Sequence, residues 1–254
     1  MKNITLIPLK TPLIKMGDSV EKVLYEVIHD LGVEVEECDV IVVAETAVAV
    51  AEGQVQELED IEPSNKAMEL ADKYEMDPRF VEIVVREADE IVGGVKGVLL
   101  TYRNETLIAN AGIDYSNAPP GTVVLFPKNP QKAAQRIRSY LEERFQKKIA
   151  VIIGDSRVQP LRRGTVGVAI AIAGMEPIED FRGRKDLYGR ELQITFRALA
   201  DDLVSAAQLL MGESNEQIPA VLIKGAPIQI VESPTLKMGI PKTECLFINS
   251  FSKK

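Results

Sequence analysis

Three acidic residues stand where predicted elements end, and their chemistry points to divalent cations. Asp114 comes after a predicted strand, Asp155 follows an apolar strand, and Glu213 follows a predicted long helix. Carboxylates at such positions commonly bind Mg²⁺ or Mn²⁺, and the hydroxyl of Ser156 adds a further oxygen ligand. The alternative that each acid only caps a turn or a helix stays open.

A second group of candidates is basic and lies in loops that contain glycine. Its runs are Arg162-Arg163-Gly164, Arg182-Gly183-Arg184-Lys185-Asp186 and Gly189-Arg190. Clustered guanidinium groups in such loops suit the bidentate recognition of phosphate or carboxylate on an anionic substrate. The alternative is a solvated surface whose charges pair with each other.

Several familiar kinds of site are excluded by residue type. The single histidine, His29, lies beside the apolar stripe of its predicted helix, which favours a structural role. Cys38 and Cys245 are far apart, and neither belongs to a Cys-x-x-Cys motif, so we expect no zinc site and no disulfide framework. Neither G-x-x-x-x-G-K-[ST] nor G-x-G-x-x-G occurs. Catalysis therefore has to use carboxylates, hydroxyls, Arg, Lys or a metal.

Composition is that of a globular protein with an acidic surface. The 254 residues include 30 basic and 38 acidic side chains, a net charge of −8, and 46% are hydrophobic. One large domain or two small ones are expected, and a nucleic-acid partner is disfavoured by the negative charge. The longest apolar stretch, 166–175, is about half as long as a membrane helix, and no secretory signal begins the sequence. We expect a cytoplasmic protein without a membrane partner.

Hydrophobic periodicity and turn residues predict an alternation of helices and strands. Helices are predicted at 20–32, 64–74, 78–88, 130–147 and 191–211. Strands are predicted at 4–9, 39–44, 97–103, 105–109, 122–126, 149–153, 166–173 and 219–223, and segment 47–53 is expected to return the chain. This mixture predicts an α/β or α+β fold, with a mixed sheet and flanking helices.

Six short motifs follow one another along the chain. They are Asp39-Val40-Ile41-Val42-Val43, Ala51-Glu52-Gly53, Asn110-Ala111-Gly112-Ile113-Asp114-x-Ser116-Asn117, Gly154-Asp155-Ser156, Gly183-x-x-Asp186-x-x-Gly189-Arg190 and Pro219-Ala220-Val221-x-Ile223-x-Gly225. In this order they resemble the coenzyme F(420):L-glutamate ligase family, from about Pro8 to Gly225. The stretch from Asn110 to Asn117 is the most specific element of the resemblance.

The resemblance implies a GTP-dependent ligase. Such an enzyme adds L-glutamate through a γ-glutamyl bond to the lactyl-phosphate-linked deazaflavin precursor of coenzyme F(420), by way of an acyl phosphate, and releases GDP and phosphate. It implies two divalent cations, Mg²⁺ or Mn²⁺, with K⁺ as an optional further ion, and an intertwined homodimer. Residues 1–225 would form the ligase domain, as one body or as two subdomains, and residues 226–254 an irregular C-terminal extension.

The resemblance also assigns roles to individual residues. The metal ligands would be Asp114, Asp155, Glu213, and Ser156 in place of the usual threonine. Asp114 and Asp155 would also be catalytic, together with Arg190, which would hold anionic substrate groups. The nucleotide would contact Thr11, Pro12, Leu13, Ile14, Glu45, Thr46, Asn117, Met211 and Gly212, and the residues that follow to Ile218.

Two departures from the family pattern leave other functions open. The lysine that usually precedes Ala-Glu-Gly is Val50 here, and Arg157-Val158-Gln159 stands where Asn-Gly-Arg is usual. Arg157 is a hypothetical replacement for the lost cation. The alternatives are a related γ-glutamyl ligase that acts on a pterin or folate, and a non-catalytic member of the family that binds nucleotide.

Overall fold

The computed structural model describes residues 3–251 and divides into two compact units. The first unit comprises Met1–Glu52 and Pro127–Met238, and the second comprises Gly53–Phe126 and Gly239–Lys254. Each unit buries an apolar core of its own. Within the described residues, no helix has both the length and the apolar composition needed to cross a membrane.

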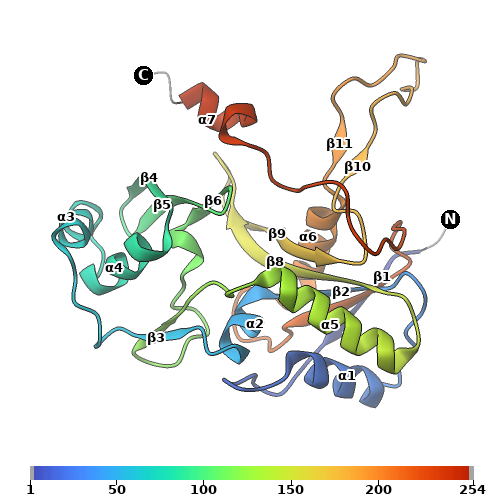
Figure 1. Cartoon of the computed structure of the whole chain (residues 1–254), viewed down its shortest axis with the longest axis horizontal. Helices are drawn as coiled ribbons and strands as arrows, with labels where there is room; N and C mark the ends of the chain where they lie inside the picture. Colours follow the sequence, from blue (N-terminus) through green and yellow to red (C-terminus); the bar gives the residue numbers. More distant parts are fainter. Residues whose placement is uncertain (1–2, 252–254) are drawn as a thin grey trace. The chain divides into compact units, whose positions relative to one another are not determined.

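A five-stranded mixed sheet forms the centre of the first unit (Figure 1). Its strand order is β1 (Thr5–Leu9), β12 (Ala220–Lys224), β2 (Val40–Ala44), β8 (Ala150–Val158) and β9 (Thr165–Ala173). The β2–β8 pair is parallel and the other pairs are antiparallel. The β-branched run of β2 is buried because both faces of the sheet are covered. The predicted mixed α/β class with flanking helices is confirmed.

Helices cover both faces of this sheet. The helices α1 (Val20–Asp30), α2 (Glu45–Ala51) and α5 (Pro130–Phe145) pack on one face, where Val151 and Ile153 point. Helix α6 (Leu199–Met211) packs on the other face, against Ala150 and Ile152. Successive side chains of a strand alternate between the two faces, so β8 contributes to both cores.

Helix α6 approaches the β8–β9 hairpin closely because two glycines lie beneath it. A Cβ atom added to Gly167 would lie 2.6 Å from the carbonyl carbon of Val204, and one added to Gly154 would lie 2.4 Å from Cγ1 of the same valine. The Ser205 hydroxyl donates a hydrogen bond to the carbonyl oxygen of Gly167 at 2.8 Å. Glycine is therefore required at 167 by packing, which fixes the position of α6.

The second unit contains two small sheets and a pair of helices. Strands β3 (Val55–Glu57) and β7 (Thr122–Val124) form one sheet, and β4 (Glu90–Val95), β5 (Val98–Arg103) and β6 (Thr106–Ala109) form the other. Helices α3 (Asn65–Tyr74) and α4 (Pro78–Glu87) pack together, and the single turn η1 (Asn110–Gly112) follows β6. The C-terminal residues of this unit form η2 (Lys242–Glu244) and α7 (Leu246–Phe251).

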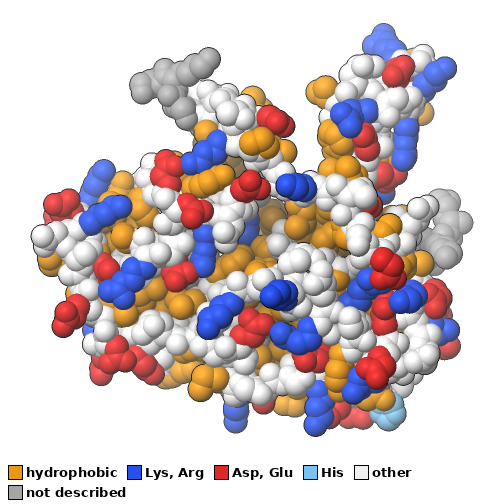
Figure 2. Space-filling model, viewed as in Figure 1, with side chains coloured by type: hydrophobic (Ala, Val, Ile, Leu, Met, Phe, Trp, Pro, Cys, Tyr) orange, Lys and Arg blue, Asp and Glu red, His pale blue; other side chains and the backbone are white. Residues whose placement is uncertain are grey.

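An extended arm belongs to the first unit. Strands β10 (Glu179–Asp180) and β11 (Phe196–Arg197) form its base, and residues 181–195 form the long loop between them. The arm projects away from the five-stranded sheet in Figure 1, and Figure 2 shows Lys and Arg side chains along it. Leu187 and Tyr188 on this loop are almost fully exposed.

Three sequence predictions of secondary structure are corrected. The predicted helix 191–211 begins only at Leu199, because Leu192, Ile194 and Phe196 alternate as in a strand and return along the arm. The predicted strand 149–153 continues to Val158, so Asp155 and Ser156 lie within β8 and not after it. The segment 47–53 belongs largely to helix α2, which begins at Glu45. The short strands β3, β4, β10 and β11 were not predicted.

Glu82 on α4 stabilises the start of α3, which gives a first testable prediction. Its carboxylate accepts a hydrogen bond from the Ser64 backbone N–H at 2.9 Å and one from Nε of Arg86 at 2.8 Å. Hydrogen bonds from Ser64, more than the charge of Arg86, lower the pKa of Glu82 to about 2. This stabilisation is complete above the unfolded-state pKa, about 4.3, and is lost as the pH falls toward 2.

We therefore expect Glu82→Gln to lower the free energy of unfolding by about 2 kcal/mol at pH 7. The deficit should shrink as the pH falls below about 4.3, because the carboxylate of the unfolded wild-type protein then takes up a proton while that of the folded protein does so only near pH 2. Urea unfolding of both proteins at pH 7 and at pH 2.5 measures this difference. An equal deficit at the two pH values would show that the charge of Glu82 contributes nothing.

Candidate functional site

Most of the predicted site residues of the first unit lie at one end of its sheet. Strands β1, β2 and β8 run in the same direction, and their register aligns Leu9 with Ala220, Ala220 with Val43, and Ala44 with Gly154. Neighbouring strands are about 4.8 Å apart, so Leu9 and Gly154 are separated by about 14 Å across three intervals. Crevices at the carboxyl ends of strands are the usual ligand sites of α/β sheets.

Three predicted nucleotide-binding segments meet at this end of the sheet. The Thr11 backbone N–H donates a hydrogen bond to the carbonyl oxygen of Gln217 at 3.2 Å, and the Ala44 N–H donates to that of Pro219 at 2.8 Å. The segment that begins at Thr11, the start of α2 at Glu45, and the loop after α6 are therefore neighbours. Thr11 and Glu45 are buried, whereas Leu13 is 67% exposed. The sequence placed these segments in one site only through the family resemblance.

Glu213 lies at the centre of a cluster of polar side chains. The hydroxyls of Ser156 and Thr165 donate to its two carboxylate oxygens, each at 3.1 Å. The side-chain amide of Gln208 donates to both Glu213 and Thr165. These four residues come from β8, from β9, from α6 and from the turn that follows α6. Three donors thus hold the Glu213 carboxylate in one orientation, next to the predicted ligand Ser156.

Asp155 points to the opposite face of β8 from its neighbour Ser156. Its carboxylate accepts a hydrogen bond from Nε of Arg157 at 3.0 Å, and both side chains are largely buried, with exposed fractions of 16% and 12%. Residues two apart in a strand share a face, whereas adjacent residues do not. The ion pair is therefore built into the strand, and Asp155 and Ser156 present their oxygens to different sides of it.

A third acid, Asp201, lies in the first turn of α6. Its carboxylate accepts a hydrogen bond from the Ala169 backbone N–H at 2.8 Å, beside the bulge in the β8–β9 pair. Burial raises the pKa of Asp201, while the hydrogen bond from Ala169 and the charge of Arg157 oppose that shift. Asp201 is thus a half-buried acid that anchors α6 to the sheet.

The donor types in the first unit fit a hard divalent cation. Asp155, Ser156 and Glu213 offer carboxylate and hydroxyl oxygens only, the ligands that Mg²⁺ and Mn²⁺ prefer. Within residues 3–251, no three His, Cys, Asp or Glu side chains converge in the geometry of a metal site. Asp155 accepts a hydrogen bond from Arg157. Glu213 accepts hydrogen bonds from Ser156, Thr165 and Gln208. A cation would therefore have to rearrange these contacts.

Asp114 and Asn117 belong to the second unit. The backbone N–H and C=O of Asp114 pair with those of Val124 at 3.1 and 2.9 Å, and its carboxylate accepts from the Ser116 N–H at 3.0 Å. Asn117 adopts a left-handed backbone conformation with φ of 56°, which asparagine tolerates. Both side chains are exposed. The predicted motif thus forms a hydrogen-bonded turn that presents Asp114 and Asn117 to solvent.

The basic runs lie on the arm and on the β8–β9 loop. Arg182 pairs with Asp180, and Arg184 and Arg197 pair with Glu179, so these cations stabilise the base of the arm. For Arg182 and Arg184 the interpretation as a salt-bridged surface is confirmed. A larger set of cations has exposed side chains and, among the described residues, no ion pair: Arg162, Arg163, Lys185 and Arg190.

Arg190 sits in a tight turn within the arm. Its backbone N–H donates to the Asp186 carboxylate at 2.9 Å, and the Asp186 N–H donates to its carbonyl oxygen at 2.8 Å. The turn fixes the backbone and leaves the guanidinium free to reach an anionic group. Over the described residues, no hydrogen bond or ion pair joins Arg190 to the Glu213 cluster, so its predicted catalytic role stays a prediction.

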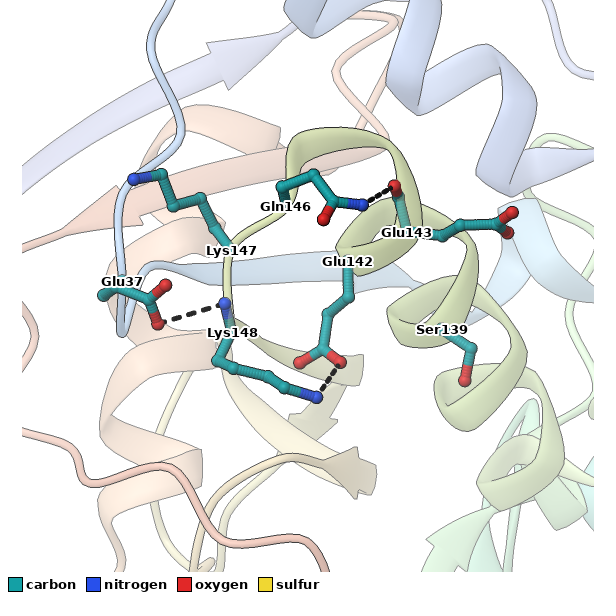
Figure 3. Close-up of a pocket in the computed structure, with 7 residues that line it drawn as sticks. All are labelled: Glu37, Ser139, Glu142, Glu143, Gln146, Lys147 and Lys148. Atoms are coloured by element: carbon teal, nitrogen blue, oxygen red, sulfur yellow. Dashed lines mark hydrogen bonds and ion pairs between the residues drawn. The ribbon is translucent and has the colours of Figure 1, made fainter.

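A separate pocket at the end of α5 contains none of the predicted site residues (Figure 3). It is lined by Glu37, Ser139, Glu142, Glu143, Gln146, Lys147 and Lys148. The Lys148 ammonium contacts Glu142 at 3.0 Å, and its backbone N–H donates to Glu37 at 3.1 Å. Glu37, Glu142 and Lys148 are thus engaged with one another within this pocket.

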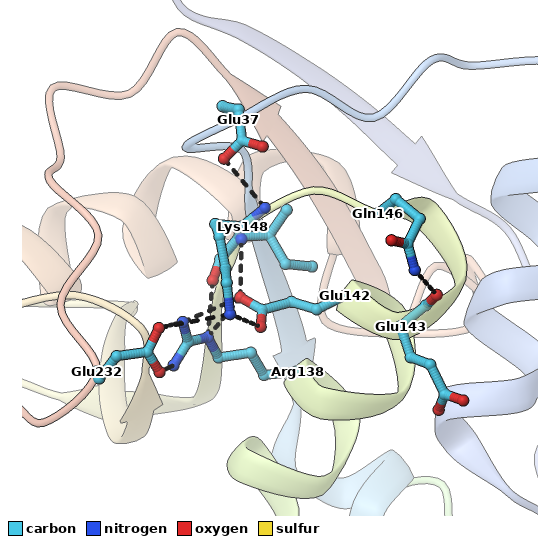
Figure 4. A network of polar contacts seen from close by, with 8 residues as sticks. Glu37, Arg138, Glu142, Glu143, Gln146, Lys148 and Glu232 are labelled. Carbon is cyan, nitrogen blue, oxygen red and sulfur yellow. Dashed lines mark hydrogen bonds and ion pairs between the residues drawn. The ribbon is translucent and has the colours of Figure 1, made fainter.

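The same end of α5 fastens the segment that follows β12 (Figure 4). The nearly buried Arg138 donates to Glu142, to the carbonyl oxygen of Ile149, and to both carboxylate oxygens of Glu232. Arg138 and Lys148 together lower the pKa of Glu232. This network holds residues near 232 against α5, within the first unit.

Three contributors to the site had no signal in the sequence. Thr165 begins β9, Gln208 lies on the last turns of α6, and Gly167 pairs with Ser156 across the hairpin. None of them belongs to a motif, and each acquires its role from the approach of α6 to the hairpin. That Thr165 and Gln208 face Glu213 becomes clear only once the register of the β8–β9 hairpin and the position of α6 are known.

The comparisons with known proteins agree with the predicted family. The sequence profile described as F(420)-0:gamma-glutamyl ligase matches residues 8–225. The coenzyme F(420):L-glutamate ligase of Methanocaldococcus jannaschii is 39% identical over 249 residues, 98% of each chain. Those of Methanothermobacter thermautotrophicus and Methanopyrus kandleri are 40% and 43% identical, over 85% and 84% of this chain and 86% and 82% of their own. The chain therefore belongs to the F(420)-0:gamma-glutamyl ligase family.

Proposed function

We propose that this protein is a GTP-dependent coenzyme F(420):L-glutamate ligase, which adds L-glutamate through a γ-glutamyl bond to the deazaflavin precursor. The observation that carries the proposal is the similarity to relatives that bear this name, which for one of them covers 98% of each chain. The gathering of Thr11, Glu45 and the loop after α6 at one end of the sheet supports it. We further propose a homodimer in the cytoplasm.

The reaction needs an activated carboxylate, because a carboxylate does not react with an amine directly. A carboxylate oxygen attacks the γ-phosphorus of GTP, the bond to the bridging oxygen breaks, and an acyl phosphate and GDP result. The amine of the second reactant then attacks the carbonyl carbon, and inorganic phosphate leaves with the C–O bonding electrons. Such phosphoryl transfer depends on positioning and charge neutralisation, and it needs no histidine.

The chain's own residues would position these groups. We propose that the backbone from Thr11 to Ile14, together with Glu45, Thr46, Asn117, Met211 and Gly212, binds the nucleotide. Asp114, Asp155, Ser156 and Glu213 would hold two divalent cations, Mg²⁺ or Mn²⁺, which when bound neutralise phosphate charge. Arg190 would bind an anionic group of a substrate from the arm. K⁺ is proposed as an optional further ion.

Val50 bears on how the phosphates are neutralised. It lies near the end of α2 and supplies no cation where the family usually has lysine. Arg157 is the candidate to replace this lysine, because it follows the predicted ligands Asp155 and Ser156 directly in the sequence. In the structure it forms an ion pair with Asp155. We propose that this arginine supplies the positive charge beside the predicted metal site.

The decisive experiment combines the protein with the deazaflavin precursor, L-glutamate, GTP and Mn²⁺. Mass spectrometry of the product and the release of GDP are followed together. A mass gain of one or two glutamates, with one GDP for each, is the expected result. Absence of product with the deazaflavin precursor, together with product from a pterin or folate acceptor, would replace this proposal by the related ligase.

A further inference from the structure

Tyr115 is an exposed aromatic ring in the loop that carries Asp114 and Asn117. Its side chain lies flat against Phe80 of α4, with ring centroids 4.6 Å apart and an interplanar angle of 19°. Phe80 is 3% exposed, whereas Tyr115 is 48% exposed. Among the ring pairs of the described residues, this is the one that stacks nearly parallel. One face of the Tyr115 ring is thus supported by the core of the second unit.

The backbone around Tyr115 is fixed by hydrogen bonds. Asp114 pairs with Val124 on one side, and the Ala118 N–H donates to the Tyr115 carbonyl oxygen at 3.3 Å on the other. Beside the ring, Arg79 forms two hydrogen bonds to Asp77, at 3.1 and 2.7 Å. Burial and the charge of Asp77 raise the pKa of the Tyr115 hydroxyl, and the charge of Arg79 opposes that shift. A rigid loop that exposes an aromatic ring loses little conformational entropy when a ligand stacks on the ring.

We propose that Tyr115 is a stacking platform for a planar heteroaromatic ring of a substrate and determines its affinity. Large exposed rings that are held rigid from behind are typical of surfaces on which bases stack, because every planar heteroaromatic ring offers a π face. The inference rests on the proposed function, whose substrates include two such rings: the guanine of GTP and the deazaflavin of the acceptor. The experiment has one arm for each.

The test titrates the full-length protein separately with GTP and with the deazaflavin precursor by calorimetry. Wild type is compared with Tyr115→Phe, which keeps the ring, and with Tyr115→Leu, which removes it. We expect Tyr115→Leu to raise the Kd of one of the two ligands about tenfold and Tyr115→Phe to leave it within about twofold. The affected ligand identifies the stacked ring. In turnover, the KM of that substrate rises while kcat changes little.

Two results would overturn the inference. Either Tyr115→Leu leaves both dissociation constants unchanged, or Tyr115→Phe weakens binding as much as Tyr115→Leu, which would assign the effect to the hydroxyl. Tyr115→Met keeps the contact with Phe80 without an aromatic ring, and it replaces the leucine variant if circular dichroism shows that the latter is unfolded. Phe80 itself is left intact because it belongs to the core.

The proposed function can fail separately from this inference. If wild type binds a ring compound but forms no γ-glutamyl product, the ligase proposal is wrong, and the comparison of Tyr115→Leu with Tyr115→Phe still decides on stacking. If wild type binds neither GTP nor the deazaflavin precursor, both proposals are overturned. Tight binding with a selective loss in Tyr115→Leu supports the platform, whatever the product assay gives.

Discussion

Replacing Asp155 by Asn should reduce the formation of γ-glutamyl product by about a hundredfold or more. The substitution keeps the shape of the side chain and an oxygen that accepts from Nε of Arg157, but it removes the negative charge. A divalent cation that neutralises phosphate needs that charge, and a neutral amide is a weak ligand by comparison. Product mass and calorimetric titration with Mn²⁺ are the two measurements.

The Asp155 prediction has a matched control. Glu143→Gln removes one negative charge from the exposed face of α5, where Glu143 is 78% exposed, and should leave turnover and Mn²⁺ binding unchanged. Circular dichroism and urea unfolding establish that both variants are folded. If Asp155→Asn retained wild-type turnover and Mn²⁺ affinity, Asp155 would be only the partner of Arg157, and the ion pair would be structural.

Replacing Gly167 by Ala should cost about 3 kcal/mol of the free energy of unfolding. The new Cβ would lie 2.6 to 2.7 Å from three backbone atoms of Val204 and Ser205, which cannot rotate away as a side chain can. Helix α6 would have to move off the hairpin, which also breaks the hydrogen bond from Ser205 to the Gly167 carbonyl. Urea unfolding measures the loss.

Gly93→Ala is the control for this prediction. Gly93 also lies in a strand and has no positive φ, but a Cβ added there meets no atom within 4 Å. We expect a change of less than about 0.5 kcal/mol, because the substitution only removes the conformational freedom of glycine. If Gly167→Ala were as mild as Gly93→Ala, the close approach of α6 would not be a requirement of the fold.

The displacement of α6 also has a functional consequence. Gln208 lies on this helix and donates to Glu213 and Thr165, so a shift of α6 pulls the amide away from the carboxylate. In Gly167→Ala, at a temperature where the protein is still folded, turnover should therefore fall as well. Gly93→Ala should leave turnover unchanged, which separates this effect from a general loss of stability.

Local signals determined the helices and strands that the sequence predicted well. Ser19, Ser64 and Asn129 each accept a hydrogen bond from the first turn of the helix that follows, as side chains of their type do at helix N-termini. The apolar run of β2 is buried on both faces, as its composition indicates. These features depend on residues within a few positions of each other, so the sequence carries them directly.

Predictions from the local sequence were wrong where a strand-like pattern and a helix-like pattern lay next to each other. Leu192, Ile194 and Phe196 precede the true start of α6 and alternate like a strand, but the helical pattern after Leu199 is strong enough to hide them. The alanines of α2 are good helix formers in a segment too short to show a period. Asp155 lies inside β8 because pairing with β9 extends this strand beyond its apolar part.

The sequence by itself determined the family, through motifs that lie in one order, and the residue types that carry the proposed chemistry. The tertiary structure alone decided which of these residues meet. Strand register puts Thr11 beside Gln217 and Ala44 beside Pro219, and the approach of α6 through Gly167 turns Ser156, Thr165 and Gln208 toward Glu213. A motif identifies residue types that the proposed chemistry requires. Contacts between elements that are distant in the sequence depend on tertiary packing, which no local pattern encodes.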